Sequence, residues 1–85
     1  MDPDATWELM LTAYQESNWD EAVEHAEDIL AWLRRGGFPP TVAVGLNKSG
    51  LMFEFHHDWV NRTTVDAVAR AIMIESRHNL ADRNG

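Results

Sequence analysis

The spacing of apolar residues changes twice along the chain, and each change marks the start of a different expected element. Residues 4–35 carry apolar side chains at intervals of three and four residues, which is typical of helices with one buried face. The stripe positions are Trp7, Met10, Leu11 and Tyr14 in the first helix, and Trp19, Ala22, Val23, Ala26, Leu30 and Leu33 in the second. Because the two helices are joined at Ser17-Asn18, we expect an antiparallel helical pair.

Signals for the ends of these helices accompany the stripes. Asp2 before Pro3 predicts an N-cap followed by proline at the first helical position, where its missing N–H does no harm. Asn18 with Glu21 three residues later fits the capping-box pattern at the second helix. After that helix, Gly36-Gly37 predicts a left-handed C-cap with a hydrophobic contact from the next residue, Phe38.

Residues 41–57 alternate with a period of two, which is typical of strands. Val42 and Val44 precede a polar turn that ends in Gly50, and Phe53 and Phe55 follow it. Two such runs predict a β-hairpin, most simply with a type I turn and Gly50 at the left-handed position. Because a lone two-stranded ribbon is marginal in water, the hairpin must lie on the helices, pair with another chain, or both.

The helical period returns in the last third of the chain. Residues 57–62 are expected to form a connecting loop, after which Thr63 caps a third helix over 63–80. Residues 81–85 are expected to fray. The whole chain, 1–85, therefore reads as one α+β domain in the order α-α-β-β-α, with a helical hairpin at 4–35, a β-hairpin at 41–57 and a C-terminal helix at 63–80.

Composition and charge exclude several classes of function. The 85 residues include no Cys, so disulfides and thiolate zinc sites are ruled out. No apolar run approaches the roughly 18–20 residues of a membrane span, and we expect a cytoplasmic protein that does not contact membranes. Residues 1–33 hold nine of the fourteen acidic residues and none of the seven Lys and Arg. Such a surface repels phosphate backbones, so a nucleic-acid partner is not expected, whereas it attracts a basic partner or a divalent cation.

One segment resembles a known family. Residues 18–24 (Asn-Trp-Asp-Glu-Ala-Val-Glu), followed by Ile29-Leu30, are similar to the second helix of a tetratricopeptide repeat. Aligned without gaps, residues 4–33 also place apolar or aromatic side chains at the expected points of the first helix. Met10 stands where the repeat has a small residue, and Arg34 stands at its terminal proline position. The resemblance implies a packed helical hairpin, but such repeats need about three stacked copies, so the family's peptide-binding role is not implied.

Histidines offer two candidate metal sites. His25 shares a helix flank with Glu21 and Asp28, although this spacing is common on solvated helix faces, which is the interpretation we favour. His56 and Asp58 could bind a metal if His78 or a second chain supplied a further ligand, since zinc takes three or four ligands. No nucleophile is placed beside a base, and we expect neither an enzyme nor a bound cofactor.

The aromatic residues suggest a different role. Trp32 is expected to cap the core against the hairpin, or else to form an exposed patch with Phe38 and Trp59 that anchors an interface. Phe53 and Phe55 on the hairpin are further interface candidates. We therefore expect a small acidic protein–protein interaction module that binds another protein or itself, as a homodimer joined through the hairpin edge or the third helix. The alternative is a metal-binding protein or small metal-dependent enzyme that uses the His/Asp cluster.

Overall fold

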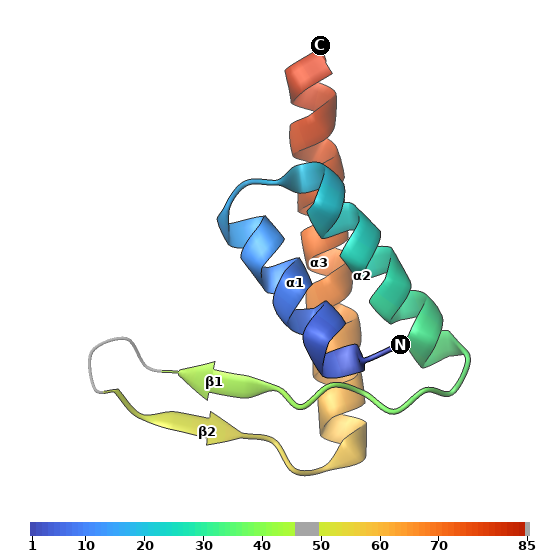
Figure 1. Cartoon of the computed structure of the whole chain (residues 1–85), viewed down its shortest axis with the longest axis vertical. Helices are drawn as coiled ribbons and strands as arrows, with labels where there is room; N and C mark the ends of the chain where they lie inside the picture. The colour runs from blue at the N-terminus through green and yellow to red at the C-terminus, as the bar shows by residue number, and fades with distance from the viewer. Residues whose placement is uncertain (46–49, 85) are drawn as a thin grey trace.

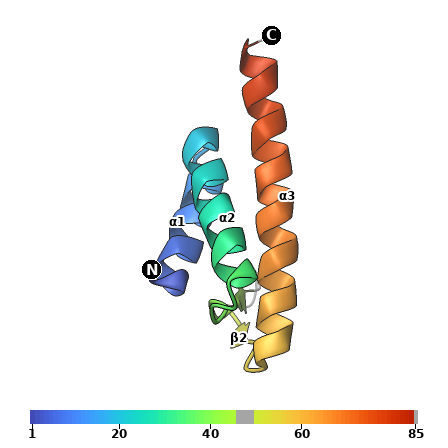
Figure 2. The same ribbon diagram turned by 90° about the vertical axis from the view of Figure 1, so that its right-hand side faces the viewer.

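The fold is α+β, with two packed helices, a two-stranded hairpin and a long C-terminal helix, in the predicted order. A computed structural model describes residues 1–45 and 50–84. The elements are α1 (Pro3–Gln15), α2 (Trp19–Arg34), β1 (Ala43–Gly45), β2 (Met52–Glu54) and α3 (Asp58–Asn84). Helices α1 and α2 run antiparallel in one layer, and α3 crosses behind that layer (Figures 1 and 2). The molecule is flat, measuring 42 × 37 × 18 Å.

Helix α2 lies at the centre of the helical packing, because it packs against both α1 and α3. Small side chains permit this close approach, since Ala22 and Ala26 of α2 are fully buried, as is Ala69 of α3. Larger apolar side chains fill the remaining space. The other buried apolar residues are Trp7, Met10, Ala13, Ile29, Leu30, Leu33, Val42, Val65 and Ile72. Among the described helices, none is long and apolar enough to cross a membrane.

Helix α1 begins as its sequence predicts and ends in a turn that also sets the start of α2. The Asp2 side chain accepts a hydrogen bond from the Ala5 N–H, with Pro3 at the first helical position. At the other end Ser17 has φ 59°, its N–H donates to Tyr14 O, and the Asn18 N–H donates to Ala13 O. This pair of bonds is a Schellman motif. The capping box expected at Asn18 is wrong, because that side chain makes no capping hydrogen bond.

Helix α2 ends in a second Schellman motif, at the predicted glycines. Gly36 has φ 83°, its N–H donates to Leu33 O, and the Gly37 N–H donates to Trp32 O. The half-buried Trp32 indole folds back over this turn, where Nε1 donates to Phe38 O at 2.7 Å. A Cβ atom on Gly37 would overlap the indole ring. The turn therefore requires glycine at Gly36 for its backbone angle and at Gly37 for the close approach of Trp32.

Helix α3 is longer than predicted at both ends. It begins at Asp58, so residues 58–62 are helical and do not form the expected loop, and it continues to Asn84. The His57 ring caps the first turn, because its Nδ1 accepts from the Trp59 N–H at 3.2 Å. Arg62 pairs with Asp58 one turn earlier, at 3.6 Å. The helical spacing of apolar residues is interrupted here because a polar residue, Asn61, faces inward. Its side chain is hydrogen-bonded to backbone groups at the base of the hairpin.

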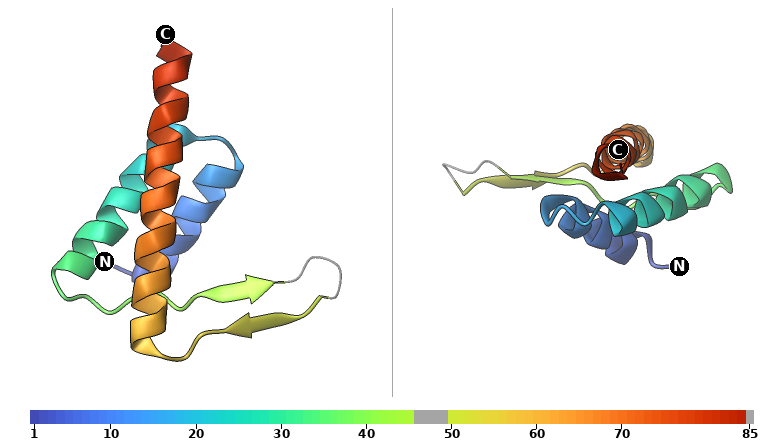
Figure 3. Two further views of the ribbon diagram at one scale, coloured as in Figure 1. Left: turned by 180° about the vertical axis from the view of Figure 1, so that it is seen from behind. Right: turned by 90° about the horizontal axis from the view of Figure 1, so that it is seen from above.

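The hairpin is antiparallel, with Ala43 opposite Glu54, Val44 opposite Phe53 and Gly45 opposite Met52. Gly50 has φ 69°, as a left-handed turn position requires; the rest of the predicted turn, residues 46–49, lies outside the described residues. The expectation that the hairpin packs on the helices holds only at its base. The two strands extend sideways from the foot of the helices, past α1 (Figures 1 and 3).

Asn61 ties this base to α3. Its Oδ1 accepts from the Val42 N–H at 3.0 Å and its Nδ2 donates to Phe55 O at 2.9 Å, so one amide bonds the chain on both sides of the hairpin. The Phe55 N–H donates to Val42 O between them, at 3.1 Å. Asn61 is only 6% exposed, and both of its bonds are therefore shielded from water.

We expect Asn61→Ala to lower the free energy of unfolding by about 2–3 kcal/mol, because it leaves a buried N–H and a carbonyl without partners. Asn18→Ala is the matched control, since that side chain makes no capping bond; it should change the free energy by less than about 0.5 kcal/mol. Urea denaturation measures both. Equal effects of the two substitutions would contradict the role assigned to Asn61.

We expect Gly37→Ala to destabilise the protein by about 1–3 kcal/mol, because the new methyl group must displace the Trp32 ring. Gly45→Ala serves as the control, since a Cβ there meets only Met52 at an ordinary 3.7 Å. Thermal unfolding followed by circular dichroism measures the stability of both variants. An unchanged unfolding temperature for Gly37→Ala would refute the close packing.

Candidate functional site

The hairpin carries an apolar face that begins in the core and continues beyond the helices. Val42, at the base, is 6% exposed, and Val44 and Phe55 are half-buried against the core. One step further out, Phe53 lies on the same face as Val44 and is 49% exposed. The Phe53 and Phe55 rings contact edge to face at 5.7 Å between centroids. The helices therefore cover the inner half of this face and leave the outer half uncovered.

The opposite face and the tip of the hairpin add to the exposed apolar surface. Met52 is 71% exposed and Leu51 63% exposed. We call residues 43–45 and 50–54 the hairpin arm. Single exposed apolar residues are ordinary on a protein surface, but adjacent ones on a projecting element are typical of interaction sites.

The other aromatic candidates lie near the foot of the helices and do not form one cluster. Trp32 and Phe38 contact edge to face at 5.6 Å, and Phe38 is 61% exposed. Trp59, in the first turn of α3, is 65% exposed and pairs with no other ring among the described residues. Trp32 is packed against the core and its indole N–H is satisfied, so it is less available to a partner than Phe38 or Trp59.

A groove separates α1 from α3. It encloses about 390 Å³ and is mostly apolar, with two polar side chains and one carboxylate at its edge. The lining residues are Leu11, Tyr14, Gln15, Val68, Ala71, Ile72 and Glu75. The Tyr14 hydroxyl donates to Glu75 Oε2 and so links the two helices across the groove. This hydrogen bond to a carboxylate raises the pKa of Tyr14 above its ordinary value of 10.0.

The opposite side of α3 is rich in arginine. Arg70 and Arg77 line a second groove together with Arg34 of α2. Arg77 pairs with Glu27 of α2, and Arg70 pairs with Asp66 one turn earlier at 2.9 Å. The first of these ion pairs joins α2 to α3, and both partly neutralise that side.

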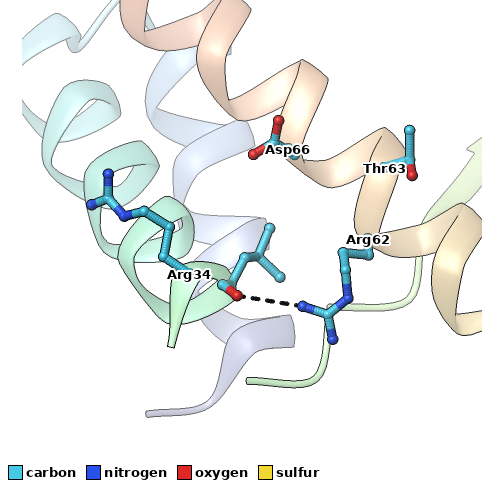
Figure 4. Close-up of a pocket in the computed structure, with 5 residues that line it drawn as sticks. Arg34, Arg62, Thr63 and Asp66 are labelled. Atoms are coloured by element: carbon cyan, nitrogen blue, oxygen red, sulfur yellow. Dashed lines mark hydrogen bonds between the residues drawn. The ribbon is translucent and has the colours of Figure 1, made fainter. Parts of the chain in front are cut away.

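A smaller pocket of about 310 Å³ lies at the end of α2 (Figure 4). The Arg62 guanidinium donates to Leu33 O at 3.4 Å, which places a positive charge at the helix C-terminus. The Arg34 and Arg62 guanidinium groups lie at opposite ends of the pocket, with Asp66 beside the space between them (Figure 4). The two arginines therefore do not converge on one point where an anion would bind.

The histidines are dispersed over the molecule. Asp58 and His78 are on the same helix, twenty residues apart, which corresponds to about 30 Å, so His78 of the same chain cannot complete a site with His56. His78 instead lies 3.3 Å from Asp82 on the projecting end of α3. His25, Glu21 and Asp28 on α2 are likewise not placed to hold a metal ion together. Across the described residues, no group of three or more His, Asp or Glu side chains is placed to hold a metal ion.

Comparison of the chain with models of protein families, with curated proteins and with solved structures found no match. The helical hairpin that the tetratricopeptide-like residues imply is present as α1 and α2. Met10, at the position where that repeat has a small residue, is fully buried.

Two features of the candidate surfaces were not predicted from the sequence. The sequence predicts a loop at Asn61, and only the inward position of this residue on α3 shows that its side chain is hydrogen-bonded at the base of the arm. The groove was missed because its walls come from helices that are distant in the chain. The one available signal was the widened apolar arc of the third helix, where Ala71 lies beside the main stripe.

The Tyr14–Glu75 bond predicts an alkaline shift in titration. Tyr14 is the only tyrosine, so ultraviolet difference absorbance reports its ionisation alone. We expect a midpoint above 10.0 that falls toward this value in Glu75→Ala. Because the folded-state pKa is raised, the stabilising contribution is complete below the unfolded-state pKa and is lost as the pH rises through the folded-state value. An identical midpoint in both proteins would show that the bond is not formed in solution.

Proposed function

We propose that this chain is a small protein–protein interaction module that binds through its hairpin arm. The observation that carries the proposal is the continuous apolar face that is buried at Val42 and exposed at Phe53. Within one copy, the core covers the inner part of this face, and the outer part stays exposed to solvent. A partner placed against it would extend that core.

The exposed apolar surface of the arm is large enough to contribute measurably to the free energy of binding. Half of a Phe side chain corresponds to roughly 100 Å² of apolar surface, and covering it contributes about 2–3 kcal/mol. Met52, which is more exposed than Phe53, adds a comparable amount from the other face. A binding site centred on one or two such side chains is typical of protein interfaces.

The backbone of the arm offers a second mode of contact. The described sheet contains two strands, β1 and β2, and no further strand pairs with the outer edge of either. Such an edge can accept an added strand from another chain, with main-chain hydrogen bonds giving affinity and side chains giving specificity. The arm is also poor in charge, since Glu54 is the one ionisable residue among its described positions.

A homodimer is one form of this interaction. Two arms related by a twofold axis would pair edge to edge, each supplying the same surface to the other. The competing arrangement, in which dimers form through the third helix, is favoured by Ile74, which is 66% exposed on α3. A dimer through the arm needs the apolar side chains of the arm, whereas a dimer through the third helix does not. Substitutions in the arm therefore distinguish the two arrangements.

We expect Phe53→Ser and Met52→Ser to weaken association of the protein, with itself or with a captured protein, by about tenfold each, because each removes about 1–3 kcal/mol of burial at the interface. Ile74→Ser is the matched control on α3. Native mass spectrometry of the untagged proteins gives the oligomeric state, and circular dichroism confirms that each variant is folded. Loss of association in Ile74→Ser alone would place the interface on α3 and overturn the role of the arm.

A further inference from the structure

The contact between α1 and α3 is an open groove, unlike the close packing of α2 against each of these helices. Helix α2 packs against both of its neighbours, whereas α1 and α3 meet across an open groove bridged by the Tyr14–Glu75 bond. Leu11, Val68 and Ile72 supply apolar walls, and Ala71, which is exposed, leaves room between them. This groove is formed with a helix outside the tetratricopeptide-like segment, so it is not the groove of that repeat.

The charge around the groove is one-sided. Glu75 lies on its α3 edge, and Glu8, which is exposed, lies one turn before Leu11 on the same face of α1. Of the described residues that line the groove, none is Lys or Arg, and residues 1–33 contain neither. Two arginines of α3 that pair with acids, Arg70 and Arg77, line the groove on the α2 side, and Arg62 lines the pocket at the end of α2. Negative charge beside the α1–α3 groove is therefore not neutralised by α3.

We infer that this groove binds an amphipathic helix of a partner protein, with an apolar stripe flanked by Lys or Arg. The inference rests on the proposed interaction function and names the chemistry of the partner. From Val68 to Glu75 the groove follows α3 for about 10 Å, which is two helical turns. Apolar side chains at positions i, i+3 or i+4, and i+7 of a bound helix span this length.

Charge complementarity selects this occupant over a second copy of the chain. A second copy carries a net charge of −7 as a whole, so like charges oppose its approach to an acidic rim. A basic amphipathic segment meets an apolar floor and an acidic rim together. The rim gives specificity and a faster encounter, and the floor gives most of the affinity.

The hairpin arm lies on the same side of the molecule as this groove. In views from the front and from behind, the arm extends past α1 and not past α2 (Figures 1 and 3). A segment lying along the groove would therefore reach toward the base of the arm with one end. One partner can contact both surfaces without bridging the body of the protein.

The test uses a synthetic amphipathic peptide of Leu and Lys as the probe, titrated into the full chain and followed by amide chemical shifts. We expect shifts centred on Leu11, Tyr14, Val68 and Ile72, and no comparable shifts for a Leu and Glu peptide with the same apolar stripe. Ala71→Arg should weaken binding of the Lys peptide at least about tenfold, because it fills the groove and adds like charge. Arginine is a good helix former at an exposed position, so this variant should remain folded.

A charge-matched pair of variants separates a specific rim contact from general attraction. Glu75→Gln should weaken the Lys peptide by about two- to fivefold, and Glu24→Gln on the exposed face of α2 should leave its affinity unchanged. Equal effects of the two, or shifts spread evenly over α1 and α2, would overturn the inference.

If the peptide fails to bind while Phe53→Ser still abolishes association, the groove is not a site and the arm stands. If the peptide binds normally to Phe53→Ser, the groove acts independently of the arm.

Discussion

The two hydrogen bonds of the Asn61 side chain set the direction of the hairpin, and the exposure of the arm depends on that direction. The bonds join α3 to the backbone on both sides of the hairpin, at Val42 and Phe55. One residue earlier, the Thr41 N–H donates to Asp4 Oδ1 of α1 at 2.9 Å. The base of the hairpin is thus held by two helices at once. With its base fixed in this way, the arm cannot fold back over the helices, and its apolar face continues outward past them.

Helix α3 divides the molecule into two chemically different sides. On the α2 side, ion pairs from Arg77 and Arg70 compensate part of the acidic surface. On the α1 side, the Tyr14–Glu75 bond spans an apolar groove with no arginine in its described lining. Surface ion pairs contribute little to stability. The main effect of these arginines is therefore on the distribution of charge over the surface, because they compensate acidic residues on the α2 side of α3. The charge that remains lies beside the groove and on the same side as the arm.

Local signals predicted the elements of this fold better than they predicted its surfaces. The cap at Asp2 and the turn at Gly36 each depend on residues close in sequence, and both are confirmed. The capping box at Asn18 failed because the Schellman turn of α1 had already fixed the backbone there. The start of α3 was placed too late because Asn61 is polar and inward, which breaks the apolar period that identifies a helix. Its bonding partners are up to nineteen residues away, so no local pattern contains them.

The candidate sites were harder to predict for the same reason. A metal site using His56, Asp58 and His78 is incompatible with a helix that starts at Asp58, because a continuous helix holds Asp58 and His78 far apart. The alternation of Phe53 with Glu54 predicts that Phe53 lies on an apolar face of the hairpin and makes it an interface candidate. The alternation marks a face, however, and does not show which part of that face the helices cover. That boundary depends on the length of α1 and on the angle at which Asn61 holds the strands.

The size of the chain connects these observations. A chain of 85 residues buries a limited fraction of its surface, and here small side chains at Ala22, Ala26 and Ala69 let α2 approach its neighbours closely. The core is thin, and none of the described helices covers the arm or fills the space between α1 and α3. Both uncovered surfaces are apolar and lie on one side, so a partner that engages one is brought near the other. Two modest contacts linked in this way give more affinity than either alone, because the second forms at a high effective concentration. Under the proposed binding function, a small domain of this design would therefore not need one large interface.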